Sequence, residues 1–157
     1  MPSKPARKPN VRLAVVTDSS ACLPRDLLQA LDIITVPLAF QLGGEEFLDG
    51  QLPAAEFYRR LEAARRAPST AAPAPGEFLE AFRQAVEGGA RAVLCITLSA
   101  EYSGTYAAAV NAAEMAASGL PGVRVEVLDA GGLAMAHGFA VLEAARAAQA
   151  GATLEEA

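Results

Sequence analysis

The chain has 157 residues, of which 52% are hydrophobic, and it carries a formal net charge of −5. This composition predicts one folded domain with its own core and excludes general disorder. The acidic balance argues against nucleic acid as a partner. No apolar run reaches the length of a membrane span and no signal peptide opens the chain, so we expect a cytoplasmic protein without stable membrane insertion.

The cysteines and the histidine bear on metal binding. Cys22 and Cys95 both lie in apolar surroundings along the sequence, and His137 is the one histidine. Because these residues are not clustered, we expect no zinc site and no cofactor. Both thiols are expected to be buried and reduced.

The first half of the chain alternates apolar and turn-forming segments. In chain order we expect a disordered basic arm over residues 1–10, a strand over 11–16 that ends in Thr17-Asp18-Ser19-Ser20, a short helix after Pro24, a strand over 33–40, a hairpin over 41–49 and a helix after Pro53. Pro37 lacks a backbone N–H, so it places the second strand at a sheet edge or a bulge. Gly43-Gly44 supplies the turn of the hairpin.

Residues 67–76 (APSTAAPAPG) interrupt this pattern. Their three prolines favour an extended, stiff loop, which would present Thr70 from a fixed position. An amphipathic helix over 77–87 is expected to follow, burying Phe78 and Phe82.

The stretch over residues 91–113 combines a strand, a polar turn and a helix. Residues 91–97 are apolar and suit a strand buried on both faces. Ser103 is placed as the N-cap of an alanine-rich helix, and Gly104 lets a ligand approach the backbone closely. Free N–H groups and the helix dipole at this point predict an anion site.

The last elements complete an α/β pattern. A strand over 123–128 ends at Asp129, and a helix is expected over 134–150. Strands alternating with helices predict a Rossmann-like, three-layer α/β/α domain with a mostly parallel sheet. Ligands of such sheets bind beyond the carboxyl ends of the strands, which is where Asp18-Ser19, Ser103-Gly104 and Asp129 fall.

We consider three functions for the polar residues at the carboxyl ends of these strands. Ser103, Asp129 and His137 occur in the chain order of an α/β-hydrolase triad, but position 101 is Glu101 where a nucleophile elbow has glycine. His137 fits a structural hydrogen bond better than a general base. Nucleotide binding is not favoured, because the sequence has neither a G-x-G-x-x-G turn after the first strand nor a P-loop lysine. The third function is a hydroxyl-lined pocket for a carboxylate or phosphate with an apolar cavity behind it.

Six motifs in order resemble the DegV family of bacterial fatty-acid-binding proteins, over nearly all of the chain after the basic arm. They are Thr17-Asp18-Ser19 with Leu23-Pro24, Val36-Pro37-Leu38, Asp49-Gly50 before Glu56-Phe57-Tyr58, Thr70-Ala71-Ala72-Pro73 with Pro75-Gly76-Glu77-Phe78, Ser99 with Ser103-Gly104-Thr105-Tyr106, and Asp129 with Gly138. The family usually has Ser-Gln at Ala71-Ala72. It also carries a second, carboxyl-terminal domain, so residues 11–157 would be its amino-terminal domain.

The resemblance implies the EDD fold of this family and a lipid-binding protein without catalysis. An acyl chain would lie in an apolar tunnel, and its carboxylate would meet Thr70 and Ser103. The ligand-binding residues that we expect are Thr70, Ser103, Gly104, Thr105, Asp18 and Ser19. Some members present the fatty acid to a separate fatty acid kinase for phospholipid synthesis. The alternative that remains is an acyl hydrolase using Ser103.

Overall fold

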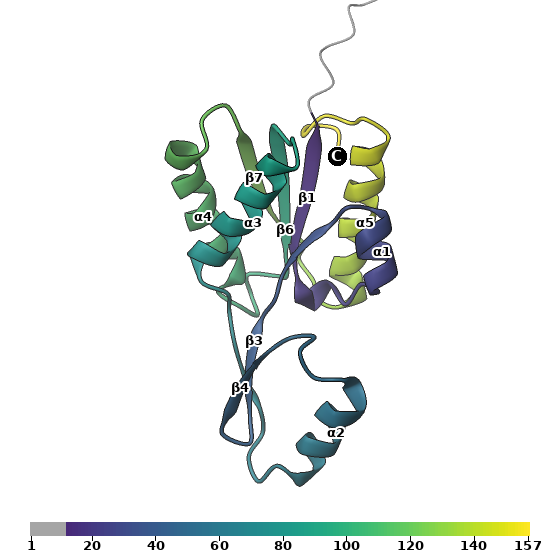
Figure 1. The fold of residues 1–157 in the computed structure, drawn as a ribbon, viewed down its shortest axis with the longest axis vertical. Coiled ribbons are helices and arrows are strands. Elements are labelled where there is room, and N and C mark those ends of the chain that lie inside the picture. The colour runs from purple at the N-terminus through teal and green to yellow at the C-terminus, as the bar shows by residue number, and fades with distance from the viewer. Residues whose placement is uncertain (1–11) are drawn as a thin grey trace, which may run out of the picture.

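A computed structural model describes residues 12–157, so the predicted basic arm of residues 1–10 lies outside the described part of the chain. In chain order the elements are β1 (Leu13–Asp18), the single 3-10 turn η1 (Ser19–Ala21), α1 (Arg25–Ala30), β2 (Ile34–Val36), β3 (Ala39–Leu42), β4 (Glu45–Leu48), α2 (Ala54–Ala63), β5 (Ser69–Ala71), α3 (Pro75–Glu87), β6 (Ala92–Thr97), α4 (Thr105–Gly119), β7 (Arg124–Asp129) and α5 (Met135–Gln149). Residues 39–71 form a small lobe, and the other described residues form an α/β body (Figure 1).

The body is built on a four-stranded sheet in the order β2-β1-β6-β7, and every neighbouring pair is parallel. Helices α3 and α4 cover one face, while α1 and α5 lie on the other (Figure 1). The predicted three-layer α/β/α fold with a mostly parallel sheet is therefore confirmed. The carboxyl ends of the strands meet at the sheet edge that faces the lobe.

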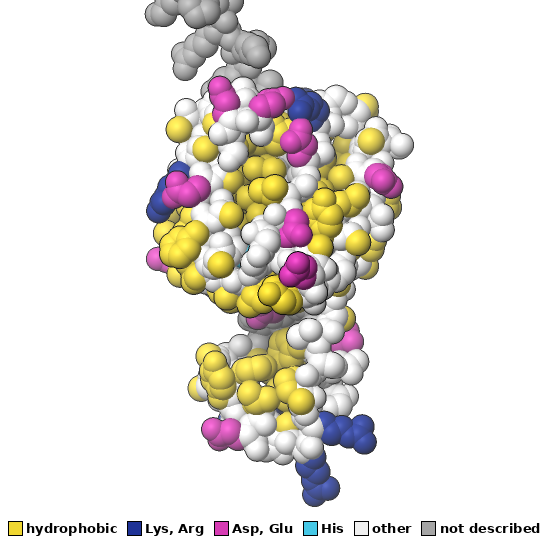
Figure 2. All heavy atoms as spheres, turned by 180° about the vertical axis from the view of Figure 1, so that it is seen from behind, with side chains coloured by type: hydrophobic (Ala, Val, Ile, Leu, Met, Phe, Trp, Pro, Cys, Tyr) yellow, Lys and Arg dark blue, Asp and Glu magenta, His cyan; other side chains and the backbone are white. Residues whose placement is uncertain are grey.

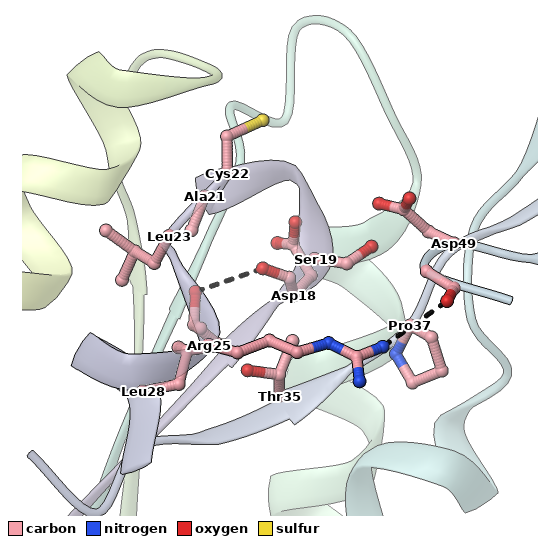
Figure 3. Close-up of a pocket in the computed structure, with 12 residues that line it drawn as sticks. Asp18, Ser19, Ala21, Cys22, Leu23, Arg25, Leu28, Thr35, Pro37 and Asp49 are labelled. Carbon is pink, nitrogen blue, oxygen red and sulfur yellow. Dashed lines mark hydrogen bonds between the residues drawn. The ribbon is translucent and has the colours of Figure 1, made fainter. Parts of the chain in front are cut away.

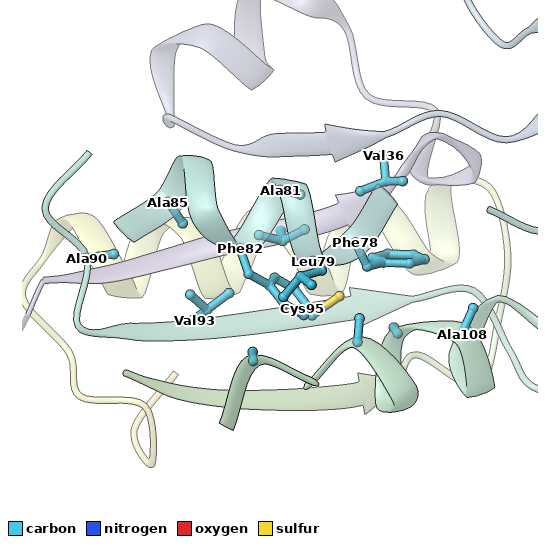
Figure 4. Close-up of a cluster of buried hydrophobic side chains, with 14 residues drawn as sticks. Val36, Phe78, Leu79, Ala81, Phe82, Ala85, Ala90, Val93, Cys95 and Ala108 are labelled. Carbon is cyan, nitrogen blue, oxygen red and sulfur yellow. The ribbon is translucent and has the colours of Figure 1, made fainter. Parts of the chain in front are cut away.

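Strand β6 lies at the centre of the core, and all six of its residues are buried. Val93 and Cys95 pack towards α3 and α4 with Phe78 and Phe82, both of which are fully buried (Figure 4). On the other face, Leu94 packs into a second cluster with residues of α5. The prediction of a strand buried on both faces is confirmed.

The lobe has its own antiparallel sheet, in the order β4-β3-β5. Phe40 of β3 stacks on Phe47 of β4 at a centroid distance of 5.5 Å, and it meets the edge of Phe57 of α2 at 5.4 Å. Aromatic packing thus joins α2 to the small sheet. Hydrophobic side chains show on the surface of the lobe, and Lys and Arg side chains project from its far end (Figure 2).

The prediction of one strand over residues 33–40 was wrong, because the chain leaves the body at Pro37. β2 pairs with β1 in the body, whereas β3 pairs with β4 and β5 in the lobe. Pro37 has no N–H to donate to a ladder, and the next N–H, that of Leu38, donates to Ser19 Oγ at 3.0 Å. The predicted edge position holds for β2, which is an edge strand, but not for β3, which is the central strand of the small sheet. The hairpin over Gly43-Gly44 is confirmed.

Two further predictions need correction. Residues 67–76 are not only a loop, because Ser69–Ala71 form β5 and pair with β3; the extended backbone that the prolines impose suits this pairing. Of the two cysteines, Cys95 is buried as predicted, but Cys22 is exposed. Cys22 follows η1 with a left-handed backbone (φ 53°), which turns its side chain out of the core.

Candidate functional site

A cavity of about 390 Å³ lies where the lobe meets the body, a size within the range of small-molecule sites. We call it the lobe cavity. Its apolar walls come from the lobe and from the segments that join it to the body. They include Leu38, Ala39, Phe40, Leu52, Ala54, Phe57, Tyr58 and Pro68. Hydroxyls reach it from both parts, since Ser19 and Ser20 belong to η1 and Thr70 to β5.

Asp18 holds η1 at the end of β1. Its carboxylate is fully buried. Oδ1 accepts hydrogen bonds from the N–H of Ser20 at 3.0 Å and from the hydroxyl of Ser20 at 2.6 Å. Oδ2 accepts one from the N–H of Leu98 at 2.8 Å. Asp18 therefore fixes the position of the serines relative to β6, and its carboxylate is already occupied by the chain's own donors.

Ser19 connects the body to the lobe. Its Oγ accepts the hydrogen bond from Leu38 N–H, which leaves its own hydrogen free to donate. Ser19 lines the lobe cavity and also a second cavity on the body side of the junction. It is the predicted site residue that the structure places most directly between the two parts of the molecule.

Ser103, Gly104 and Thr105 form a separate cluster at the start of α4. The N-cap is Gly104, not Ser103 as predicted, because α4 begins at Thr105, one residue later than an N-cap at Ser103 would place its start. Ser103 still contributes to this terminus, since its Oγ accepts the N–H of Thr105 at 3.3 Å and lies 2.8 Å from Thr105 Oγ1. Thr105 is fully buried, and nothing lies within 4 Å of where a Cβ of Gly104 would stand. This open space is compatible with close approach of a ligand.

The six predicted site residues thus fall into groups. Thr70 and Ser19 line the lobe cavity, and Asp18 anchors η1 through its hydrogen bonds to Ser20. The Ser103 cluster does not line that cavity and belongs to the body. Ligand contacts of all six remain predictions.

The hydrolase triad does not assemble. His137 is fully buried, with Nε2 3.0 Å from Thr17 Oγ1 and 3.1 Å from the carbonyl oxygen of Ile96. The Asp129 carboxylate instead accepts the N–H groups of Ala100 and Gly131, at 3.1 and 2.8 Å. Within the described residues, Ser103, Asp129 and His137 make no hydrogen bond to one another. The predicted structural role of His137 is confirmed.

Local sequence patterns do not mark several residues that line the lobe cavity. Ser20, Leu52 and Pro68 carry no motif that points to a ligand. They come together only because the hairpin and α2 fold against η1. The aromatic residues Phe40 and Phe57 in adjacent predicted elements are the one signal that indicates an apolar site here.

The sequence of this chain matches a known protein family over all of its described residues. The model of the family described as "Uncharacterised protein, DegV family" matches residues 12–157. The chain belongs to the DegV family. A DegV domain-containing protein of Streptomyces coelicolor is 40% identical over 145 residues, and one of Listeria innocua is 36% identical over 147 residues. They match 92% and 93% of this chain respectively, and 50% of their own length in each case.

Solved structures of DegV proteins share the fold. A fatty-acid-binding DegV family protein from Thermus thermophilus has a TM-score of 0.78 and 35% identity. The match covers 92% of this chain and 50% of that chain. A stearic-acid-binding protein from Eubacterium ventriosum has a TM-score of 0.81 and 27% identity, over 91% of this chain and 50% of that chain. The fatty-acid-binding DegV of Bacillus subtilis has a TM-score of 0.81 and 28% identity, over 92% and 50%.

The chain therefore spans about half the length of the DegV relatives that it matches. Among residues 12–157, no helix has the length and apolar character needed to cross a membrane.

Proposed function

We propose that this chain binds a long-chain fatty acid, with the acyl chain in the lobe cavity and the carboxylate held by hydroxyls. The observation that carries the proposal is the lobe cavity itself, in which aromatic and aliphatic walls open towards the hydroxyls of Ser19, Ser20 and Thr70. The fatty-acid-binding proteins of Thermus thermophilus and Bacillus subtilis, which share this fold, support it.

The acyl chain would dominate the affinity. Burial of a methylene contributes about 0.8 kcal/mol, so a tail of about fourteen methylenes contributes at most ~11 kcal/mol. Ordering the flexible tail offsets part of this. A hydrogen bond from a hydroxyl to the carboxylate adds only about 1.5–3 kcal/mol. The hydroxyls would therefore determine the orientation of the ligand more than its affinity.

In the proposed orientation Thr70 and Ser103 donate to the carboxylate, and the α4 N-terminus at Gly104 and Thr105 adds its positive dipole end. Ser19 would contact the ligand where the lobe joins the body, with its hydroxyl oxygen held by the N–H of Leu38. These roles are proposed from the family resemblance, since Thr70 lies in β5 on the lobe cavity and Ser103 lies outside that cavity at the start of α4.

The finer parts of the proposal rest on family resemblance. The protein would act in the cytoplasm, catalyse no reaction itself and present its fatty acid to a fatty acid kinase. Head-group contacts from the second half that relatives carry would complete the site. The stronger binding would then be found in a chain of full family length.

Substitution of the hydroxyls tests the head-group contacts. Thr70→Val keeps the shape of the side chain and removes its donor, so we expect an affinity for palmitate about tenfold lower, the effect of one lost hydrogen bond. Ser69→Ala is the matched control in β5, because Ser69 does not line the lobe cavity. Titration calorimetry measures both variants. Equal affinities would remove Thr70 from the site.

Ser103→Ala should also weaken binding, but it removes the acceptor of the Thr105 N–H and so lowers stability by about 1 kcal/mol. A thermal melt must accompany the titration. A folded Ser103→Ala variant with unchanged affinity would contradict the proposed role of Ser103.

A further inference from the structure

A second cavity, of about 500 Å³, lies on the body side of the lobe junction. We call it the Arg25 cavity. It adjoins the lobe cavity, with which it shares Ser19, Asp49 and Gly50. Its charged lining residues are Arg25, Asp18 and Asp49, and its apolar surface includes Leu23, Leu28 and Pro37. An acyl chain in the lobe cavity makes no use of these charges.

Arg25 and Asp49 are two opposite charges without ion-pair partners. Neither residue takes part in a salt bridge among the described residues. Arg25 makes one long hydrogen bond, from Nη2 to the carbonyl oxygen of Gly50 at 3.4 Å, so most of its N–H groups are free for a ligand. Figure 3 shows its side chain reaching from α1 across the cavity towards the loop of Asp49.

The walls that carry these groups are fixed by backbone hydrogen bonds. The N–H of Asp49 donates to the carbonyl oxygen of Leu38 at 2.8 Å. This bond holds the loop after β4 against the segment that joins β2 to β3. Thr35 of β2 lies beside the aliphatic part of the Arg25 side chain in Figure 3. Its Oγ1 is buried and has no hydrogen-bond partner among the described residues.

The balance of charge decides which ligand fits. The donors of Ser20 and Leu98 already use most of the acceptor positions of the buried Asp18 carboxylate, so Asp49 is the more accessible carboxylate of this cavity. Asp18 and Asp49 still make this region unfavourable for an anion alone. Partial burial, and then the carboxylates of Asp49 and Asp18, raise the pKa of the Cys22 thiol on the cavity wall. A cation alone would be opposed by Arg25. A ligand that carries both charges avoids both penalties.

We propose that the Arg25 cavity binds a small zwitterion of the α-amino acid class with an apolar side chain. Its carboxylate pairs with the guanidinium of Arg25, which suits bidentate contact with carboxylates. Its ammonium group faces Asp49, and its side chain packs against Leu23 and Leu28. The site is distinct from the acyl site, although the two cavities share Ser19, Asp49 and Gly50.

The test begins with thermal melts of the whole chain in the presence of apolar L-amino acids, from alanine to phenylalanine. Each is used at about 10 mM, above the dissociation constants of weak small-molecule sites near 1 mM. Titration calorimetry then compares L-leucine with leucinamide, which lacks the carboxylate, and with 4-methylpentanoate, which lacks the amine. We expect L-leucine to bind at least about tenfold more tightly than either analogue, since each has lost one charge-assisted contact.

Charge-removing variants locate the binding. Arg25→Gln and Asp49→Asn should each weaken L-leucine binding about tenfold or more, whereas Arg83→Gln on the exposed face of α3 should not. Palmitate titration of Arg25→Gln separates the two sites, because Arg25, unlike Asp49, does not line the lobe cavity. Absence of a melting shift with every amino acid, equal binding of 4-methylpentanoate and L-leucine, or unchanged binding by Arg25→Gln would overturn the proposal. Palmitate binding that persists in those cases would leave the fatty-acid function standing.

Discussion

Cys95 is a fully buried thiol at the centre of β6, and burial raises its pKa well above the ordinary value. In the unfolded chain the thiol ionises near its ordinary value of about 8.5, while in the folded protein it stays protonated. The pKa of the Cys95 thiol is therefore higher in the folded protein than in the unfolded chain. Its contribution to stability is complete below about pH 8.5 and decreases as the pH rises above that value.

We therefore expect the free energy of unfolding to fall above about pH 8.5, with roughly 1 kcal/mol of the loss per pH unit due to Cys95. Urea unfolding at pH 7.5, 9 and 10 measures it. Cys95→Ala lowers stability at every pH but should show a smaller decline with pH. Parallel declines in wild type and Cys95→Ala would mean that other groups cause the alkaline loss.

Ala134, the N-cap of α5, has a φ of 53° and a ψ of −138°, a conformation that favours glycine. Such backbone strain is of order 1–3 kcal/mol, partly offset in a glycine variant by greater freedom of the unfolded chain. Ala134→Gly should therefore raise the free energy of unfolding by about 1 kcal/mol. Ala117→Gly, on the exposed side of α4, should lower it by about 1 kcal/mol. If both variants lose stability equally in urea, Ala134 is not strained.

At the scale of elements, α5 packs closely on η1 at Gly138. A Cβ at this position would lie 2.5 Å from the carbonyl oxygen of Ala21 and 3.2 Å from Leu23 Cδ2. Gly138→Ala must push α5 and η1 apart, and overpacking of this kind costs about 1–3 kcal/mol. Because η1 carries Ser19 and Ser20, palmitate affinity should fall as well.

Gly76→Ala in α3 is the matched control, since nothing lies within 4 Å of a Cβ there and alanine favours the helix. Urea unfolding and palmitate titration of both variants check the expectation. A Gly138→Ala protein as stable as wild type would show that the two elements have room to separate.

The elements of the body could be predicted from the sequence, whereas those of the lobe could be predicted only in part. The body follows from local signals, because apolar strands alternate with helices along the chain, as β6 precedes the alanine-rich α4. The lobe depends on pairing between distant segments, such as Phe40 with Thr70, and no local pattern encodes that pairing. The lobe cavity shares this difficulty. Thr70 and Ser19 could be selected through family resemblance, whereas the aromatic wall at Phe40 required the folded lobe.

At the scale of the whole molecule, the layered body positions polar groups at its sheet edge and the lobe supplies an apolar wall. The chain leaves the body for the lobe through Pro37 and returns through Ala72-Pro73-Ala74. The lobe cavity at this junction needs both parts, since Ser19 and Ser20 come from the body and Phe57 from the lobe. Fatty-acid binding is therefore expected to be a property of the assembled chain, and not of either part alone.

The most direct test of fatty-acid binding in the lobe cavity is the palmitate affinity of two neighbouring tryptophan variants in α2. Ala54 lines the lobe cavity, whereas Ala55, the next residue, does not, and both are exposed. Ala54→Trp fills space that the acyl chain needs, so we expect a loss of affinity of about tenfold or more, equal to two or more buried methylenes. Ala55→Trp should bind palmitate as the wild type does. Equal affinities for the two variants, in proteins that melt alike, would contradict the placement of the acyl chain in the lobe cavity.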